Sequence, residues 1–465
     1  MSKIKPSLSK GTRDFLPQEV AKRNYIFDII KSVFRKYGFE QIETPAIERL
    51  ETLTGKYGEE GDKLLFKILN SGDYFSEIRN SKFEIRNLTS QEATTLISEK
   101  GLRYDLTVPL ARYVVQHQDK LAFPFKRFHI GPVWRADRPQ KGRYQEFYQC
   151  DADVIGSNSL LNEVELLQIY IEVFRLLRFD PQEPGQKLVV TINNRKILQG
   201  VIEYLDAQNL SSQFFTIIDK ADKIGYDGVM SELSNVGFTQ DQLTKLQHIF
   251  SQRQNVDRAL DYFDVIFKDI ELGRKGVDEI RYVLSHLNQV DRTNHVIYDI
   301  LLARGLDYYT GLIVEVKILD AKVGSVGGGG RYDNLTEMFG GQNLSGVGIS
   351  FGIERIYDVM EELNLFPETI AQGVKVLFVA RNAEVEEFTF KQVQTLRDDD
   401  IPAEIFLGNV KKQKHFTYAE QKGIPFMVEI GENEMASGNF RLRNVKERKE
   451  EAAGLSIQDL KTKFI

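Results

Sequence analysis

The segment from residue 125 to residue 156 constrains the fold most strongly, because it combines two long runs of strand-forming residues. The runs FKRFHIGPVW and YQEFYQCDADVI flank the turn-rich, charged stretch ADRPQKGR, an arrangement typical of a long antiparallel hairpin. Side chains alternate between the two faces of a strand, so Phe147, Gln149, Asp151 and Asp153 point the same way. The sequence therefore predicts an antiparallel sheet with an aromatic ring, an amide and carboxylates in a row on one face.

Two arginines stand beside this polar face. Arg135 lies near the loop end of the first strand, and Arg143 lies just across the loop. Guanidinium groups beside an aromatic ring suit a nucleotide, because the base can stack on Phe147 while the arginines hold phosphate oxygens. The alternative is a half-solvated hairpin with surface ion pairs. The concentration of strong hydrogen-bonding groups between otherwise apolar strands favours the nucleotide site.

The rest of the chain alternates between helical and strand-like patterns. Its 465 residues suffice for two or three domains at roughly 150 residues each. An amphipathic helix ends at Gly38, and a second helix is expected over about 160–178. Strands are expected at 102–107 and 187–194, in addition to the hairpin.

Three regions of the chain differ in pattern. Residues from about 195 to 290 are polar and mostly helical in pattern, whereas strands and glycines return between 300 and 355. After residue 373, strands and helices alternate as in a small α/β domain. We therefore expect an α+β domain over 1–365, interrupted by a helical insertion at about 195–290, and an α/β domain over 373–465.

Composition limits the classes of function. The formal net charge is −6, so a nucleic-acid partner would have to bind at local basic patches. Cys150 is the only cysteine, which excludes an intrachain disulfide and a cysteine metal cluster. No apolar run approaches the ~20 residues that cross a bilayer, and the start of the chain lacks the apolar stretch of a secretion signal. We expect a cytoplasmic protein that does not enter membranes.

Three further segments carry candidate site residues. GSVGGGGRYDNL (324–335) has no Walker or dinucleotide pattern, so a phosphate cradle, close approach to a flat ligand and a tight turn all remain open. LARGLDYY places Arg304 ahead of Tyr308 and Tyr309, whose rings could equally be core aromatics. GVGISFGIERI puts Arg355 in the first turn of a helix, where the dipole disfavours a cation, so a ligand anion is its better explanation.

In this order, the segments resemble the class II aminoacyl-tRNA synthetases, and specifically the histidyl-tRNA synthetase family, over nearly the whole chain. The helix, strand and Pro45 at the start resemble motif 1, VWRADRPQKGRYQEFYQCDADV resembles motif 2 and GVGISFGIERI resembles motif 3. These three motifs fix only the class. LARGLDYY and GSVGGGGRYDNL resemble the two histidine-specific motifs, and KGTRDFLP and YDLTVPLARY also match.

The resemblance implies an α+β catalytic core built on an antiparallel sheet, a helical insertion and a C-terminal α/β anticodon-binding domain. It also implies a role for individual residues. Those implied to bind histidine are Asp105, Thr107, Arg135, Gln149, Asp153, Arg304, Tyr308 and Tyr309. Those implied to bind ATP are Arg135, Arg143, Phe147 and Arg355, and those implied to act in catalysis are Arg135, Arg304 and Arg355.

The implied function is ATP-dependent activation of L-histidine and transfer to tRNA(His) by a homodimer. Mg²⁺ is expected with ATP, with its protein ligands unassigned and Glu315 as a candidate. Basic stretches that could meet tRNA include Lys126 with Arg127, the hairpin loop, and residues 411–415, although such runs are usually solvated faces. The insertion is expected to contact tRNA or to be structural rather than to edit, because pairing both ring nitrogens of histidine already gives high selectivity.

Three rival functions remain for comparison. A catalytically silent, synthetase-like regulatory subunit of histidine biosynthesis would resemble the core but usually lack the C-terminal domain and have degraded motifs. A class II synthetase for another amino acid should lack the RGLDYY and GGGGRYD segments, both of which are present here. A nucleotide-binding scaffold outside translation fits the motifs least well.

Overall fold

The computed structural model describes residues 5–74, 76, 79, 89–140, 142–180, 182–252, 256–287, 296–303, 309–319, 321, 323–334, 336–367, 370, 373–407 and 412–464. Contacts divide the chain into two compact units. The first comprises Met1–Asp14 with Arg23–Leu365, and the second comprises Phe15–Lys22 with Phe366–Ile465. Each unit has its own sheet and its own buried core.

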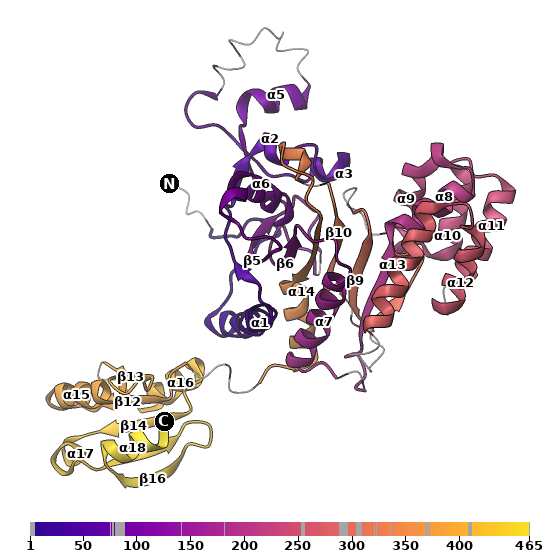
Figure 1. Ribbon diagram of the computed structural model, residues 1–465. Coiled ribbons are helices and arrows are strands. Elements are labelled where there is room, and N and C mark those ends of the chain that lie inside the picture. The colour runs from indigo at the N-terminus through magenta and orange to yellow at the C-terminus, as the bar shows by residue number, and fades with distance from the viewer. Residues whose placement is uncertain are drawn as a thin grey trace. The chain divides into compact units, whose positions relative to one another are not determined.

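The first unit is built on a sheet of eight strands among the described residues (Figure 1). Their order is β1 (Glu40–Gln41), β5 (Phe125–Trp134), β6 (Glu146–Ile155), β11 (Gly346–Gly352), β10 (Gly327–Tyr332), β9 (Leu312–Ile318), β7 (Leu188–Asn194) and β8 (Val296–Tyr298). Neighbours are antiparallel except for the outermost pairs, β1–β5 and β7–β8. The predicted hairpin is β5–β6, and the antiparallel core is confirmed.

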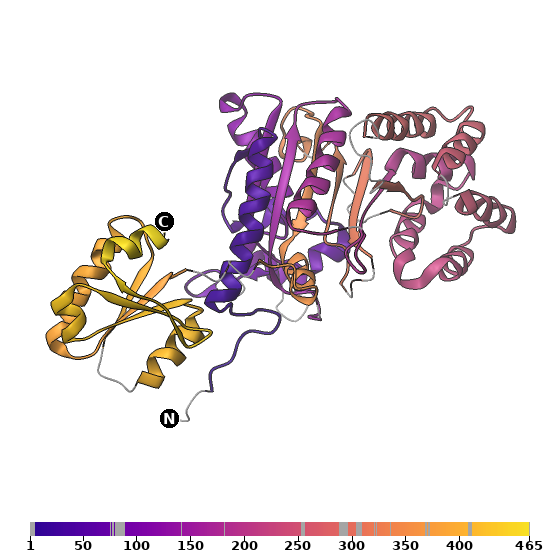
Figure 2. The same cartoon turned by 90° about the horizontal axis from the view of Figure 1, so that it is seen from below.

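Three helices cover one face of this sheet (Figure 2): α1 (Pro17–Lys36), α7 (Leu161–Leu176) and α14 (Ile353–Glu362). On α1, the ring of Phe34 lies 5.4 Å from that of Phe128 on β5, and on α7 the ring of Phe174 lies 6.1 Å from that of Phe351 on β11. Phe351 pairs with Cys150 on β6, so the odd-numbered polar residues of β6 face the other way. The core therefore occupies one face of the sheet and leaves the opposite face for a site.

Among the described residues, a small three-stranded sheet with four helices lies before the hairpin in the sequence. The strand order is β2 (Ile47–Arg49), β4 (Lys100–Leu102) and β3 (Lys67–Ile68), and the helices are α2 (Leu50–Leu53), α3 (Gly58–Lys63), α5 (Ser90–Ile97) and α6 (Thr107–His117). The prediction of a strand over 102–107 is wrong, because β4 ends at Leu102 and α6 begins at Thr107. The Asp105 carboxylate accepts a hydrogen bond from the Val108 amide and so favours the helix start.

The predicted helical insertion is confirmed. It contains α8 (Arg195–Tyr204), α9 (Ser211–Ile218), α10 (Ala221–Asn235), α11 (Gln240–Ser251), α12 (Val256–Ile266) and α13 (Glu271–Leu287). Helices α8 and α13 meet at glycines, since a Cβ on Gly200 would lie 2.7 Å from Cα of Gly273. Both helices contact β7, which joins the insertion to one side of the large sheet (Figure 1).

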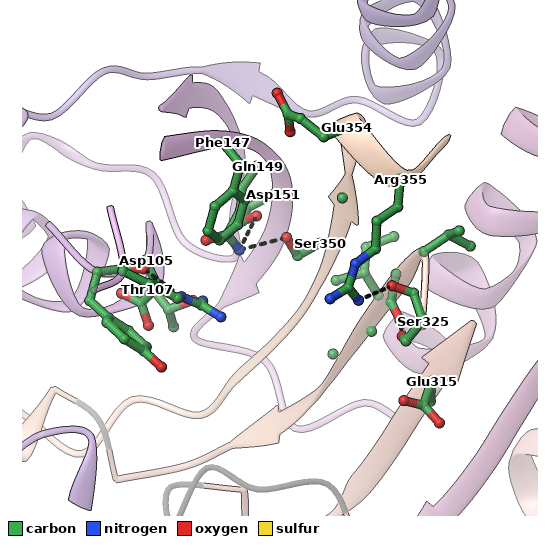
Figure 3. Close-up of a pocket in the computed structure, with 18 of the residues that line it drawn as sticks. Asp105, Thr107, Phe147, Gln149, Asp151, Glu315, Ser325, Ser350, Glu354 and Arg355 are labelled. Atoms are coloured by element: carbon green, nitrogen blue, oxygen red, sulfur yellow. Dashed lines mark hydrogen bonds between the residues drawn. The ribbon is translucent and has the colours of Figure 1, made fainter. Parts of the chain in front are cut away.

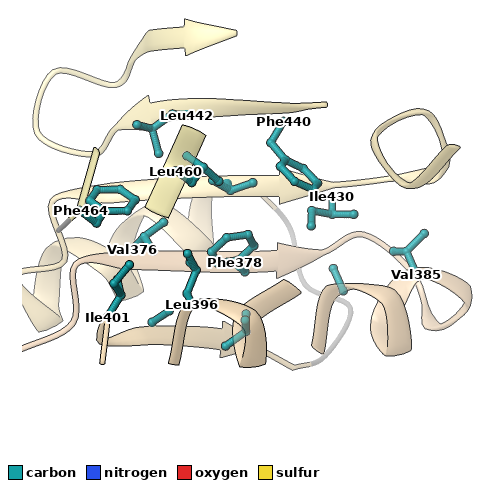
Figure 4. Close-up of a cluster of buried hydrophobic side chains, with 14 residues drawn as sticks. Val376, Phe378, Val385, Leu396, Ile401, Ile430, Phe440, Leu442, Leu460 and Phe464 are labelled. Atoms are coloured by element: carbon teal, nitrogen blue, oxygen red, sulfur yellow. The ribbon is translucent and has the colours of Figure 1, made fainter. Parts of the chain in front are cut away.

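The second unit is a five-stranded sheet with helices, as predicted for the C-terminal domain. The strand order is β13 (Ala403–Phe406), β12 (Val376–Ala380), β14 (Phe426–Ile430), β15 (Phe440–Asn444) and β16 (Lys449–Leu455), and the helices are α15 (Glu386–Arg397), α16 (Lys412–Lys422), α17 (Glu432–Ser437) and α18 (Ile457–Phe464). Phe378, Phe440 and Leu460 belong to its buried core (Figure 4). The strand β16 was not anticipated, since it carries only one strongly apolar residue, Leu455.

Two residues of the predicted basic stretches are not available to a nucleic acid. Arg127 is completely buried, and only 6% of His415 is exposed. Lys411, which belongs to the same C-terminal stretch, lies outside the described residues. Within the described part of the chain, the helices are all too short or too polar to span a bilayer.

Candidate active site

A cavity of about 460 Å³ lies on the polar face of the large sheet. Nine of the residues assigned to the site by resemblance line it: Asp105, Thr107, Arg135, Arg143, Phe147, Gln149, Asp153, Tyr309 and Arg355. The two others, Arg304 and Tyr308, lie outside the described residues. The alternation predicted for β6 is confirmed, because Phe147, Gln149, Asp151 and Asp153 all line the same cavity. Asp105 and Thr107 lie at one end in Figure 3, and Arg355 lies at the other.

Asp105 is a buried acceptor at the first end of the cavity. Its Oδ1 accepts hydrogen bonds from the Tyr57 hydroxyl at 3.1 Å and from the Val108 amide at 3.1 Å. Its Oδ2 has no hydrogen-bond partner among the described residues. Burial raises the pKa of Asp105, and the Val108 amide and the Arg135 guanidinium oppose that rise. Oδ2 is therefore free to accept from a donor that enters the cavity.

Gln149 and Asp151 form a network with Ser350 on the neighbouring strand. The Gln149 Nε2 donates to Ser350 Oγ at 2.8 Å and, more weakly, to Asp151 Oδ1 at 3.4 Å (Figure 3). Ser350 is the register partner of Asp151 and makes a side-chain hydrogen bond to it. Burial raises the pKa of Asp151 to about 7, with Arg127 lowering it and Asp153 raising it. Neither Asp151 nor Ser350 was assigned a role from the sequence.

Asp153 is held by a buried cation and a phenol. Its Oδ2 lies 2.7 Å from the Arg127 Nη2, and its Oδ1 accepts a short hydrogen bond from the Tyr332 hydroxyl. Burial raises the pKa of Asp153, and Arg127 opposes this. The sequence alone did not reveal Arg127 as a site residue. One signal was available: Arg127 is a charged residue in an apolar strand, and it pairs in register with Asp153.

The arginines of the cavity are held in place by backbone carbonyl groups and aromatic rings. The Arg135 Nε donates to the Tyr104 carbonyl at 3.1 Å, and the guanidinium lies 4.2 Å from the Tyr104 ring centre and 5.2 Å from that of Phe147. The Arg355 guanidinium donates to the Gly142 carbonyl at 2.8 Å. It also donates to the Ser325 carbonyl at 2.6 Å (Figure 3). Fixed guanidinium groups at both ends of one cavity suit an anionic ligand.

The glycine run forms a strand, β10, so the interpretation of this segment as a tight turn is wrong. Gly328 and Gly329 line the cavity. A Cβ on Gly330 would lie 2.8 Å from the Tyr309 ring, and one on Gly329 would lie 2.1 Å from the carbonyl oxygen of Gly348. Only glycine leaves room for Tyr309 and for the adjoining strand β11.

An acidic rim lines the cavity on the side of the insertion. Glu315 on β9 pairs with Lys317 at 2.9 Å, and Lys317 also contacts Asp222 of α10. No group of three or more carboxylate, histidine or cysteine side chains within the described ranges could hold a metal ion.

An antiparallel sheet that carries a cavity with fixed arginines beside an aromatic ring, followed by a separate α/β unit, is the architecture of a class II aminoacyl-tRNA synthetase. A family model described as histidyl-tRNA synthetase matches residues 11–76 and 90–356, and a model described as anticodon binding domain matches residues 373–465. The chain belongs to the histidyl-tRNA synthetase family.

Similar proteins support this membership. A histidine–tRNA ligase of Bacteroides fragilis (strain YCH46) is 51% identical over 442 residues, which cover 95% of each chain. One of Christiangramia forsetii is 47% identical over 444 residues, covering 95% of this chain and 96% of the other. The crystal structure of histidyl-tRNA synthetase from Nostoc sp. PCC 7120 matches with a TM-score of 0.79 and 28% identity over 99% of both chains.

A structure described as an ATP phosphoribosyltransferase regulatory subunit/histidyl-tRNA synthetase from Bacillus halodurans C has the same fold. Its TM-score is 0.70, at 18% identity over 90% of this chain and 96% of the other. The fold alone therefore does not separate an enzyme from a regulatory subunit. The relatives that are about half identical over nearly the whole chain favour the enzyme.

Proposed function

We propose that this cavity is where the protein activates L-histidine with ATP, and that the histidyl group then passes to tRNA(His). In the first step a histidine carboxylate oxygen bonds to the α-phosphorus while the bond to the leaving pyrophosphate breaks. In the second step a ribose hydroxyl of the tRNA bonds to the carbonyl carbon and AMP leaves. The observation that carries the proposal is that Arg135 and Arg355 line one cavity with the buried acceptors Asp105, Gln149 and Asp153.

The residues at one end of the cavity suit the amino acid. We assign the α-ammonium group to Asp105, Thr107 and Gln149, since carboxylate, hydroxyl and amide oxygens accept from its N–H groups. Asp153 and Tyr309 are assigned to the imidazole, and so is Tyr308 by resemblance. The Arg127 cation favours the ionised form of Asp153, which can accept from a ring N–H.

The cavity's arginines and its aromatic ring suit ATP. We assign the substrate carboxylate and the α-phosphate to Arg135, the phosphates to Arg143, and the adenine to Phe147 and Arg355. Arg304 is assigned to the α-phosphate by resemblance. Two anions must meet in this reaction, so fixed positive charge supplies the main stabilisation. A side-chain general base is not needed for activation, because the attacking carboxylate is already ionised.

Mg²⁺ would accompany ATP, and Glu315 fits as one of its carboxylate ligands. Mg²⁺ commonly binds through one or two carboxylates together with substrate phosphates and waters, which agrees with the sparse acidic rim. When bound, the ion would neutralise phosphate charge. Lys317 holds the Glu315 carboxylate in the apoprotein, so it would have to share that carboxylate with the ion.

We infer further that the protein acts as a homodimer in the cytoplasm. Motif 1, at the start of the chain, is the dimer segment that the resemblance implies, and nearby Ile47 on β2 is 50% exposed. The single cysteine is buried and free, which fits a reducing compartment. Sedimentation velocity at micromolar concentration tests the dimer, and a purely monomeric species would refute it.

A charging assay separates the enzyme from the regulatory subunit. Purified protein with histidine, ATP, Mg²⁺ and tRNA(His) transcript should yield histidyl-tRNA, and protein without tRNA should yield histidyl-adenylate. A folded protein that binds histidine but forms neither product would support the regulatory role instead.

A further inference from the structure

The side-chain amide of Gln149 is held by two acceptors on one side. Its Nε2 donates to Ser350 Oγ at 2.8 Å and to Asp151 Oδ1 at 3.4 Å. An amide nitrogen has two hydrogens, so both are used within the protein. Its Oε1 is buried and has no hydrogen-bond partner among the described residues. The carbonyl end of the amide therefore remains available to a donor in the cavity.

The reverse orientation of the amide is disfavoured electrostatically. When Asp151 is ionised, rotation by 180° would place Oε1 beside its carboxylate, where two sets of lone pairs would meet without a hydrogen. Ser350 would have to donate to Oε1 instead of to Asp151, which would leave a carboxylate only 2% exposed without either hydrogen bond. The network thus selects one of two orientations that differ only in which atom faces the cavity.

A second unused acceptor lines the same cavity. Asp105 Oδ2 also lacks a hydrogen-bond partner within the described ranges, and it is buried in the lining of the same cavity. Two unpartnered acceptors, one of them a carboxylate, are complementary to an ammonium group with its three N–H donors. If the Gln149 amide faced the cavity with its nitrogen, its N–H donors would instead repel an ammonium group.

We propose that Asp151 and Ser350 are positioning residues, which hold Gln149 so that its Oε1 accepts from the α-ammonium group of the substrate. The inference rests on the proposed function, because it assumes that the amino acid binds at this end of the cavity. It adds two residues on neighbouring strands that need not touch the substrate. Ser350 acts as the bridge, since it accepts from Gln149 and donates to Asp151.

The test compares histidine with 3-(imidazol-4-yl)propionate, which is histidine without its α-amino group. In ATP–pyrophosphate exchange, Asp151→Asn should raise the KM for histidine about tenfold or more, the effect of losing one hydrogen bond to a charged group, with the KM for ATP nearly unchanged. The inhibition constant of the analogue should stay within about twofold of the parent value, because its binding does not use the ammonium site.

Ser350→Ala should act in the same direction, and Ser350→Thr, which keeps the hydroxyl, should restore the parent KM. Ser98→Ala is the control, because Ser98 carries a buried hydroxyl outside the cavity that donates to the carbonyls of Ile68 and Lys100. An unchanged KM for histidine in both cavity variants would overturn the proposal. So would a parallel loss of analogue binding, which indicates general damage. A parent protein with no histidine-dependent exchange would instead refute the proposed function.

Discussion

The guanidinium of Arg127 lies 2.7 Å from the carboxylate of Asp153, and the two side chains are 0% and 3% exposed. Asp105 is buried nearby and raises the pKa of Asp153. Asp151 is also buried, and Arg127 lowers its pKa while Asp153 raises it. When no substrate is bound, the three buried carboxylates therefore have few neighbouring cations to balance their negative charge. This excess of negative charge is a reason for the site to bind an ammonium group.

Arg127→Leu is expected to destabilise the protein by about 3–5 kcal/mol, because it leaves a buried carboxylate without its cation. Adding Asp153→Asn should recover much of that loss, since the uncompensated charge disappears. Urea denaturation measures both variants. The control is Arg281→Leu, whose half-exposed pairs with Asp261 and Asp264 should contribute at most about 1 kcal/mol. Equal losses in both arginine variants would contradict the role of burial.

Asp151 should make the stability of the apoprotein depend on pH. Its pKa is about 7 in the folded protein and near 3.8 in the unfolded chain, so the folded state holds the proton more tightly. The contribution of Asp151 to the free energy of unfolding is complete below about pH 4 and is lost as the pH rises through about 7. The Tm of Asp151→Asn minus that of the parent should rise over this window and level off above it. A difference independent of pH would show that Asp151 ionises normally.

Other groups near Asp151 also have to be considered in this pH dependence. They are Arg127 and His129 on β5, Asp153 on β6 and Ser350 on β11. Burial, Arg127 and Arg103 lower the pKa of His129 to about 3, so its imidazole stays neutral over the pH range in which Asp151 titrates. The change in the Tm difference therefore reports the carboxylates and not the imidazole.

Gly348→Ala should damage histidine binding without touching the ATP end of the cavity. A Cβ at this position would lie 1.9 Å from Asp153 Oδ1, so the carboxylate would have to leave Arg127 and Tyr332. We expect the KM for histidine to rise by about tenfold or more, the scale of one lost hydrogen bond to a charged group. Gly373→Ala is the control, because its Cβ would meet nothing within 4 Å. An unchanged KM for histidine would argue against Asp153 as an imidazole ligand.

Arg135→Ala should lower the rate of adenylate formation by about two to three orders of magnitude, the effect of removing a fixed donor from developing charge. The protein should stay folded, because within the described ranges Arg135 makes one hydrogen bond, to the Tyr104 carbonyl, together with two ring contacts. Single-turnover formation of AMP-linked product measures the rate, with circular dichroism for the fold. A rate within about threefold of the parent would refute the assignment.

Local patterns predicted the parts of the site that lie within one strand. Alternation along β6 placed Phe147, Gln149, Asp151 and Asp153 on one face, and the loop between strands placed Arg135 and Arg143 beside it. The two-domain order and the helical insertion followed from changes in periodicity. These features depend on neighbours in the sequence, and period-two and period-3.6 patterns record such neighbours directly.

Partners on other strands were not predictable in the same way. Ser350 meets Asp151 through the register of β6 with β11, almost 200 residues later in the sequence. A single sequence carries no local pattern that reveals which distant strands pair. The strand expected at 102–107 failed because the Asp105 carboxylate favours a helix start there. The glycine strand β10 has no side-chain alternation to reveal it, and it is stabilised by β9 and β11 on either side.

The most direct measurement is ATP–pyrophosphate exchange by the purified protein with each of the twenty amino acids in turn. We predict exchange with histidine alone, lost in Arg135→Ala. Rejection of the other nineteen should reach about 10⁴-fold, because a site that pairs an imidazole leaves buried polar groups unsatisfied with any other side chain. Exchange driven by a different amino acid, or no exchange with histidine by folded protein, would contradict the proposed site.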